Sequence, residues 1–331
     1  MPHDFTPLQI RLLSYLRQKS GSALSTEELA EILRVSPLTI AQSLEELSQE
    51  GYHFTRSDEG EIAGFAAPDR LLAHEIIAGL PTKVLGRQIY SFETITSTNV
   101  EAYSLALRDE PEGTLVVAEE QSGGKGRLGR DWHSPPRQGI YASLILRPQI
   151  SPALAPGFSL VVAVNLVECI SELLGIEAKI KWPNDVLIDG RKVAGILTEL
   201  AAGADVVRFL IVGVGININQ DIADFPAEIA DKATSLKIVS GAPVNRVELL
   251  QKLLIKLEKR YLHFITDGLA AQLDTIKAHS SVLSRQIAFR RGGKSISGRA
   301  IDINGEGMLL VEVDGEVMTL AAGEITLEEN Y

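Results

Sequence analysis

Residues 121–132, which read QSGGKGRLGRDW, are the stretch whose residue types and spacing point most directly to chemistry. Four glycines alternate with Lys125, Arg127 and Arg130, so three cations fall within six residues of a chain whose formal net charge is −11. Glycine allows backbone N–H groups to turn toward a ligand, and Lys and Arg neutralise phosphate or carboxylate groups. The stretch therefore predicts a mobile anion-binding loop, with a solvated surface loop as the alternative.

The spacing of Gly124, Gly126 and Gly129 matches the letters of the dinucleotide-binding fingerprint, but the context does not. That fingerprint needs a helix directly after the loop, whereas residues 130–136 read RDWHSPP and cannot begin one. Lys125 also lacks the following Ser or Thr of a P-loop. We therefore reject both of these nucleotide-binding motifs.

Three further stretches lie at or near the ends of strand-like runs. They are KWPND at 181–185, RKVAGIL at 191–197 and GVGININ at 213–219. Each has a plain structural reading, as a packed corner, a solvated strand lysine or a bend in a strand. Strand ends of one sheet gather at one mouth, where ligands bind, so together the stretches predict a single site that includes the 121–132 loop.

The composition is that of a globular protein of two or three domains. The 331 residues are 45% hydrophobic and 23% charged. The apolar run 160–174 contains Asn165, Glu168 and Glu172, so we read it as a buried helix and expect no membrane span. The N-terminus lacks a secretory pattern, Cys169 has no disulfide partner, and the six histidines show no metal-ligand spacing. We therefore expect a cytoplasmic protein.

The first 65 residues predict three short helices and a hairpin. Helix starts are indicated by Thr6-Pro7, by a capping box from Ser25 to Glu28, and by Ser36-Pro37. Two strand-like runs follow at 52–56 and 61–65. The inward positions of the second helix are expected to be Leu29, Ile32 and Leu33. This order is typical of a winged helix-turn-helix.

The charge of this N-terminal unit opposes DNA binding. Residues 1–70 contain six Lys or Arg and eleven Asp or Glu, a net charge of −5, and the presumed reading helix at 37–50 has three glutamates and no basic residue. DNA binding depends on cations that displace counterions. A small helical protein-interaction module is therefore the alternative.

The rest of the chain predicts an α+β architecture. A linker helix is expected at 68–79, and from residue 83 strands and helices alternate in an order that favours a mixed sheet. The expected strands are 88–92, 114–120, 140–147, 178–182, 185–188, 192–200 and 206–213, and the expected helices are 98–108, 156–174 and 244–265. From about residue 281, short strands expected at 285–290, 297–303, 308–313 and 317–321, with glycine turns between them, indicate a small β-barrel.

Taken together, these motifs resemble the bacterial bifunctional biotin–protein ligases and biotin-operon repressors over essentially the whole chain. The family's glycine-rich biotin loop resembles residues 124–130, and its Ser-Thr-Asn motif matches residues 97–99. KWPND is unchanged at 181–185, and Lys-x-Ala-Gly-Ile-Leu is present at 192–197. The family usually has arginine where this loop has Lys125, which keeps the charge but lacks the planar fork of a guanidinium.

The resemblance implies a division of the chain. It places a winged helix-turn-helix DNA-binding domain at 1–66 and a linker helix at 67–82. It places a biotin/lipoate-ligase-like catalytic domain with a mixed sheet at 83–275, and an SH3-like β-barrel at 280–331.

The resemblance also implies a reaction and its residues. Biotin and ATP, with Mg²⁺, form biotinyl-5′-AMP, and biotin then passes to a lysine of the biotin carboxyl carrier protein of acetyl-CoA carboxylase. The implied catalytic residues are Lys192, Arg127 and Lys181. The implied biotin-binding residues are Ser97, Thr98, Asn99, Gln121, Gly124, Lys125, Gly126, Arg127 and Lys192. The implied nucleotide-binding residues are Arg130, Trp132, Asn184, Asp185 and Asn217, with Mg²⁺ near Asp185 and no metal held by the protein alone.

A regulatory function is implied as well. Biotinyl-AMP acts as a corepressor, the liganded protein is a homodimer, and operator DNA of the biotin genes is a partner. The implied DNA-binding residues are Thr26, Ser36, Pro37, Thr39, Gln42 and Ser43. Three alternatives stay open: a ligase without repressor activity, a ligand-sensing regulator without catalysis, and a ligase for another acid such as lipoate.

Overall fold

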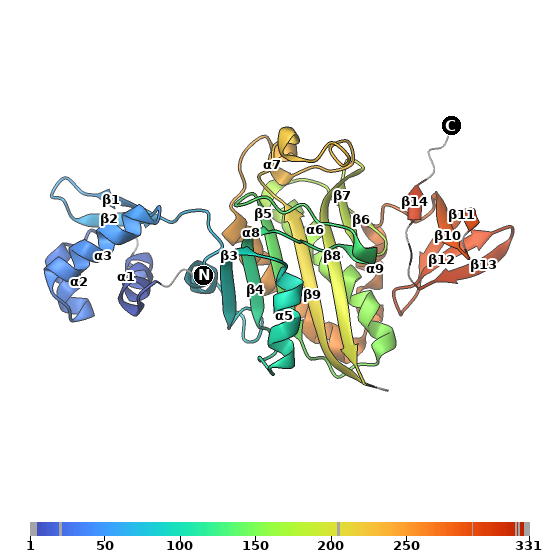
Figure 1. Ribbon diagram of the computed structural model, residues 1–331, viewed down its shortest axis with the longest axis horizontal. Coiled ribbons are helices and arrows are strands. Elements are labelled where there is room, and N and C mark those ends of the chain that lie inside the picture. The colour runs from blue at the N-terminus through green and yellow to red at the C-terminus, as the bar shows by residue number, and fades with distance from the viewer. Residues whose placement is uncertain are drawn as a thin grey trace.

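The computed structural model describes residues 5–19, 22–203, 206–292, 294–321, 323 and 325–327. Three units follow one another along the long axis of the molecule (Figure 1). The N-terminal helices and hairpin lie at one end, a large sheet with its helices lies in the middle, and a small sheet lies at the other end. The α+β class is confirmed.

The N-terminal unit contains three helices and a two-stranded antiparallel hairpin. They are α1 (Pro7–Gln18), α2 (Thr26–Leu33), α3 (Pro37–Gln49), β1 (His53–Arg56) and β2 (Ile62–Ala66). Thr6 and Ser25 form the capping boxes of α1 and α2, as their sequences indicate. The arrangement is compatible with a winged helix-turn-helix, and its core is a separate hydrophobic cluster.

One expected core residue of this unit is on the surface. Ile32 is 40% exposed. The short helix α2 instead buries Leu29, Ala30 and Leu33, which form a single stripe that leaves position 32 outside. The expectation of an inward Ile32 was wrong.

The predicted linker helix is shorter than expected, because α4 spans only Ala73–Ala78. The residues before it are held by contacts to the central sheet. The Leu71 N–H donates to Glu119 Oε1 at 2.6 Å, and the Leu71 carbonyl accepts from Ser91 Oγ at 2.5 Å. These backbone groups are satisfied by tertiary partners, so this segment stays non-helical.

Arg246 joins the linker to the central sheet. Its side chain is fully buried and pairs with Asp69 at 3.1 Å and with Glu119 at 2.6 Å. Nη1 also donates to the Gly139 carbonyl at 3.1 Å. A buried guanidinium is tolerated only when it is paired in this way, so the start of the linker has a defined position on the sheet.

The central sheet has seven strands in the order β3-β4-β5-β9-β8-β7-β6. β3 and β4 are parallel and the other neighbours are antiparallel, which confirms the predicted mixed sheet. The strands are β3 (Ile89–Ile95), β4 (Leu115–Gln121), β5 (Gly139–Leu146), β6 (Lys179–Lys181), β7 (Asp185–Ile188), β8 (Arg191–Ala202) and β9 (Val207–Asn217).

Helices cover both faces of this sheet (Figure 1). α5 (Thr98–Leu107) lies on one face, and α6 (Phe158–Leu174) and α8 (Arg246–Asp267) lie on the other. The apolar stretch Pro152–Leu174 is long enough to cross a membrane, but 78% of its most apolar window is buried within the protein, as in the core helix of a globular domain. Cys169 lies in this helix, where burial raises the pKa of its thiol to about 12. Two short helices, α7 (Leu236–Ser240) and α9 (Leu273–Ala278), were not predicted.

The C-terminal unit is a five-stranded antiparallel sheet in the order β13-β12-β11-β10-β14. The strands are β10 (Gln286–Arg291), β11 (Lys294–Ile303), β12 (Leu309–Val313), β13 (Glu316–Leu320) and β14 (Ile325–Leu327). Four of them were predicted, and β14 was not. The buried Trp182 donates its indole N–H to the Gly307 carbonyl at 2.9 Å, so the unit is fastened to the central sheet next to the KWPND segment.

Candidate functional site

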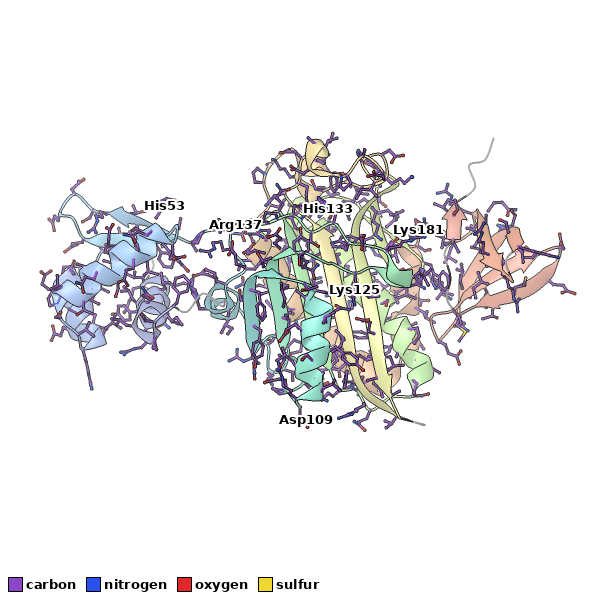
Figure 2. All side chains as sticks on the ribbon, viewed as in Figure 1. His53, Asp109, Lys125, His133, Arg137 and Lys181 are labelled. Atoms are coloured by element: carbon purple, nitrogen blue, oxygen red, sulfur yellow. The ribbon has the colours of Figure 1, made fainter. Side chains whose placement is uncertain are left out.

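A cleft of about 350 Å³ lies where the four sequence motifs meet. Its walls come from the start of α5, the end of β4, the 121–132 loop, the β6–β7 connection and strands β8 and β9. Thirteen of the residues expected in the site line it: Ser97, Thr98, Asn99, Gln121, Lys125, Gly126, Arg127, Arg130, Trp132, Lys181, Asn184, Asp185 and Lys192. Figure 2 labels Lys125 on the central unit and Lys181 at the side of that unit nearer the C-terminal sheet.

Thr98 and Gln121 form a polar floor at one end of the cleft. Gln121 Oε1 accepts from the backbone N–H of Thr98 at 2.8 Å and lies 3.1 Å from its hydroxyl. Gln121 Nε2 donates to Ser134 Oγ at 3.0 Å. Because its two amide ends have different partners, Gln121 has a single orientation, and this end of the cleft offers fixed polar groups without a net charge.

Asn99 lies beneath this floor and is 4% exposed. Its amide Nδ2 donates to Glu199 Oε2 at 2.7 Å, and its Oδ1 accepts from Ser143 Oγ at 2.6 Å. A Cβ on Gly213 would lie 2.0 Å from Asn99 Oδ1. Glycine at position 213 is therefore what allows Asn99 to cross strand β9 and reach β8.

Trp132 lies across two glycines on neighbouring strands. A Cβ on Gly215 would lie 2.4 Å from the indole, and a Cβ on Gly195 would lie 3.0 Å from it. The indole N–H is buried and has no hydrogen-bond partner among the residues that the structure describes. The backbone of β8 and β9 at these two glycines thus forms a flat surface on which the Trp132 ring packs. The indole N–H lies there without an acceptor among the described residues.

Cations line the other end of the cleft. Lys192 Nζ lies 2.7 Å from Asp185 Oδ1 and 5.3 Å from the centre of the Trp132 ring. Arg127 Nη1 donates to Asn184 Oδ1 at 2.9 Å, and Asn184 Nδ2 donates to the Ile196 carbonyl at 2.8 Å. The motifs KWPND and KVAGIL therefore meet the glycine-rich loop through side chains.

The glycine-rich loop is folded over the cleft. Its chain closes on itself, because the Gly126 N–H donates to the Arg130 carbonyl at 2.7 Å and the Trp132 N–H donates to the Gly124 carbonyl at 2.9 Å. Leu128, at the tip, has a φ of 58° and is 76% exposed. The contact between Arg127 and Asn184 joins this tip to the β6–β7 connection.

Two expected ligand-binding residues lie outside the cleft wall. The buried Asn217 donates Nδ2 to the Thr234 carbonyl at 3.1 Å, and it supports the 218–236 segment. Gly124 is buried beneath the loop, where a Cβ would lie 2.6 Å from the Trp132 carbonyl. Its lack of a side chain serves the packing of the loop.

Sequence reasoning missed several residues of the site. Ser134, Ser143 and Glu199 fix the polar floor, and Gly323, Ile325 and Thr326 of the C-terminal unit line the cleft. Glu199 lies two residues after Leu197, on the same face of β8, so strand alternation could have indicated it. Nothing in the sequence near residue 325 indicates that it lines this cleft.

The residues expected to contact DNA are only partly on the surface of α3. Ser36, Pro37 and Gln42 are exposed and Thr39 is partly exposed, as is Thr26 on α2. Ser43 is 6% exposed and packs in the core of the N-terminal unit. Its assignment to a DNA-contacting surface was wrong, because the helical period places position 43 beside the inward Ile40 and Leu44.

Comparisons with known proteins agree with this geometry. The model of the biotin/lipoate A/B protein ligase family matches residues 91–217, and that of the biotin protein ligase C-terminal domain matches residues 282–327. The bifunctional ligase/repressor BirA of Bacillus subtilis (strain 168) is 36% identical over 316 residues, which cover 96% of this chain and 97% of that protein. The biotin–acetyl-CoA-carboxylase ligase of Mycobacterium tuberculosis (strain ATCC 25618 / H37Rv) is 31% identical over 244 residues, which cover 72% of this chain and 88% of that protein.

The fold of most of the chain is also known from a solved structure. The biotin protein ligase from Aquifex aeolicus, in complex with biotin and ATP, superposes with a TM-score of 0.64 and 28% identity. The superposition covers 74% of this chain and all of that one. The identity along nearly the whole chain, together with a cleft built from the four motifs, leads to one assignment. The chain belongs to the biotin protein ligases, in the group of the bacterial bifunctional ligase/repressors.

Proposed function

We propose that the protein forms biotinyl-5′-AMP from biotin and ATP and transfers biotin to a lysine of the biotin carboxyl carrier protein of acetyl-CoA carboxylase. The observation that carries this proposal is the order of groups along the cleft. The neutral polar floor of Thr98 and Gln121 is at one end, and Lys192 and Arg127 are at the other. This order suits a molecule with a polar ring and a terminal carboxylate that must meet a phosphate.

The first step would be assisted by the cations. A carboxylate oxygen of biotin attacks the α-phosphorus of ATP, the bond to the bridging oxygen breaks, and pyrophosphate leaves with the electron pair. The Lys192 ammonium offsets charge at the carboxylate and bridging oxygen, and Arg127, Lys125 and Arg130 do so at the phosphates, with Lys181 at the same end. Preorganised charges of this kind are the main source of catalysis in phosphoryl and nucleotidyl transfer.

In the second step the neutral amine of the carrier lysine attacks the acyl carbon of the mixed anhydride. AMP leaves with the electron pair, and the amine proton passes to solvent. The loop must cover the anhydride until then, since water would otherwise hydrolyse it. The exposed tip at Leu128 is suited to open for the carrier lysine.

We propose that Mg²⁺ enters this cleft together with ATP. Among the described residues, no group of three His, Cys, Asp or Glu could hold a metal. Asp185 lines the cleft and offers a carboxylate beside Asn184. Mg²⁺ commonly binds through one or two carboxylates and the substrate's phosphates, whose charge it neutralises.

The polar floor favours biotin over lipoate, although the family model includes ligases for both. The ureido ring of biotin carries N–H and C=O groups that can pair with Thr98 and Gln121. The dithiolane ring of lipoate carries neither, so it could not make hydrogen bonds to the Thr98 hydroxyl and the Gln121 amide. A site built for hydrogen bonds rejects an analogue that lacks them by large factors.

The ligase assay separates the substrate alternatives. The full-length protein is mixed with ATP, Mg²⁺ and a biotin carrier domain, and with either biotin or lipoate, and the mass of the carrier is read. We expect the mass of one biotinyl group and no lipoyl group. An unmodified carrier together with no pyrophosphate release would refute the ligase reaction.

A repressor function is the second part of the proposal, and its support is the match to a bifunctional ligase/repressor that extends through the N-terminal unit. We propose that biotinyl-AMP is the corepressor and that the liganded protein acts as a homodimer on operator DNA of the biotin genes. Few cations are available for DNA, and Arg17 is already paired with Glu75 at 2.6 Å. Two copies are therefore needed to multiply a weak contact.

The repressor proposal predicts DNA binding that depends on ligand. Promoter DNA of the biotin genes is titrated with the apo protein and with the biotinyl-AMP complex at several salt concentrations. We expect specific binding of the liganded protein only, with a shallow salt dependence because few phosphates are neutralised. Tight binding by an apo monomer would contradict the coupling, and no specific binding in either state would leave a ligase without repressor activity.

A further inference from the structure

A buried chain of hydrogen bonds runs beneath the polar floor, and it begins at Glu199. Glu199 Oε2 accepts from Asn99 Nδ2 at 2.7 Å. A carboxylate offers only acceptors, so the NH₂ end of the Asn99 amide must face β8 and its carbonyl end must face β5. The Leu197 carbonyl, 3.5 Å from the same nitrogen, favours this orientation as well.

The orientation of Asn99 fixes the hydroxyl of Ser143. Asn99 Oδ1 can only accept, and Ser143 Oγ lies 2.6 Å from it. Ser143 is fully buried, so no bulk water competes for its single hydroxyl hydrogen. That hydrogen is therefore directed to Asn99, and the Ser143 oxygen is left as an acceptor.

The direction of the Ser143 hydroxyl then decides what Thr98 can do. Thr98 Oγ1 lies 2.8 Å from Ser143 Oγ and 3.1 Å from Gln121 Oε1. Gln121 Oε1 can only accept, so the single hydroxyl hydrogen of Thr98 is donated inside the protein. Its oxygen lone pairs are left for a ligand in the cleft, where Thr98 is an acceptor.

We propose that Glu199 is a positioning residue that sets the direction of this chain and so makes the site selective for a ring with an N–H donor at Thr98. The proposal rests on biotin being the substrate, and it adds the reason for ring selectivity. Without a carboxylate at position 199, the Asn99 amide could reverse, and Ser143 could then donate to Thr98. Ser143 would then take a lone pair of Thr98 that is otherwise free for the N–H of the ring.

The test compares three variants of this chain with a control on the same strand. Glu199→Ala removes the acceptor, Glu199→Gln keeps a carbonyl acceptor, and Ser143→Ala removes the middle of the chain. Thr198→Ala is the control, because Thr198 contacts Ser159 on α6, at 2.9 Å, on the opposite face of β8. Pyrophosphate release by each full-length variant gives kcat and the KM values for biotin and ATP.

Glu199→Ala should raise the KM for biotin about tenfold, the effect of one misdirected hydrogen bond, and leave the KM for ATP within twofold. Glu199→Gln should recover most of the loss. Ser143→Ala should show the same biotin-specific defect, and the double variant should add little to it, since both residues act through one chain. Thr198→Ala should change neither KM.

The preference for biotin over a ring-modified analogue is a second measurement, and a general loss of rigidity would not change it. The wild type should strongly prefer biotin to an analogue methylated on the ureido nitrogens, and Glu199→Ala should reduce this preference several-fold. A KM for biotin within twofold of wild type would overturn the inference, as would equal losses for biotin and ATP with a lowered melting temperature. If Glu199→Ala does not fold, Glu199→Gln and Ser143→Ala decide by the same criteria. Failure of the wild type to release pyrophosphate would refute the proposed function itself.

Discussion

Lys192 and Asp185 form an ion pair at the cationic end of the cleft, with Nζ 2.7 Å from Oδ1. The pair spans the β7–β8 hairpin, whose ladder contains a bulge between Val186 and Leu187. The Lys192 side chain is 35% exposed and lines the cleft, so it is accessible to a second carboxylate. The lysine that we propose to bind the substrate carboxylate is thus already positioned by a carboxylate of the protein, that of Asp185.

The Lys192→Ala variant should remain folded and lose most adenylate formation. A contact that is stronger in the transition state than in the bound substrate typically contributes about 10²–10³ in rate, so a loss of that size is expected in kcat for pyrophosphate release. The matched control is Lys179→Ala on β6, whose lysine pairs with Glu177 at 2.6 Å and does not line the cleft. A Lys192→Ala rate within threefold of wild type would exclude the proposed function of this ammonium.

Gly215→Ala should displace the Trp132 ring from the surface of β8 and β9. The new methyl group would lie 2.4 Å from the indole, which is well inside van der Waals contact, so the ring must move. We expect a red-shifted Trp132 emission and a more than tenfold loss of adenylate formation, with Trp182 as a buried and constant background. Gly203→Ala, where the nearest atom would be 3.8 Å from the new Cβ, is the control. Unchanged emission and rate in Gly215→Ala would show that Trp132 does not rest on this strand.

Local signals in the sequence predicted much of the fold and the site. The caps at Thr6 and Ser25 mark helix starts because a capping hydrogen bond joins residues only three apart. The strand-end motifs converge on one cleft because the strands of one sheet end along the same edge. Both inferences need only short-range geometry.

Features that depend on distant parts of the chain could not be predicted. The segment before α4 is not helical because Glu119 and Arg246, far along the chain, bind its backbone and Asp69. Strand alternation can indicate the face on which Glu199 lies, but its partner Asn99 is 100 residues away and no local pattern marks that pair. Strand β14 is three residues long, too short for a period to show, although Ile325 and Thr326 line the cleft.

The loop should be protected from proteases by ligand. Trypsin cleaves after Lys125, Arg127 and Arg130, and Arg127 joins the loop tip to Asn184. Biotinyl-AMP should slow cleavage at these positions at least fivefold, because its phosphate gives the cations a common partner. Arg127→Ala should cleave faster than wild type after Lys125 without ligand. Equal cleavage rates with and without ligand would contradict closure of the loop over the adenylate.

The contact between the N-terminal unit and α4 should weaken on mild acidification. His74 on α4 lies 4.4 Å from Phe5, ring centre to ring centre, and its Nε2 is 2.6 Å from the Tyr52 hydroxyl. That hydroxyl donates to Glu75 at 2.8 Å, so the neutral imidazole must donate from Nε2 to the Tyr52 oxygen. Burial, with Arg17 and Arg70 nearby, lowers the pKa of His74 from 6.5 to about 4.

The direction in which stability changes with pH follows from proton linkage. Between pH 6.5 and about 4 the unfolded chain binds a proton at His74 that the folded protein does not, so stability falls as the pH falls, by up to about 1.4 kcal/mol per pH unit. The other charged groups at this contact are Arg17, Arg70 and Glu75, and they stay in place in a His74→Gln variant. Urea unfolding at intervals from about pH 7 to 5, above the range where ordinary carboxylates titrate, should show a shallower slope in His74→Gln than in wild type. His263→Gln, on the exposed face of α8, is the control and should keep the wild-type slope. Equal slopes in all three proteins would show that His74 is not held neutral at this contact.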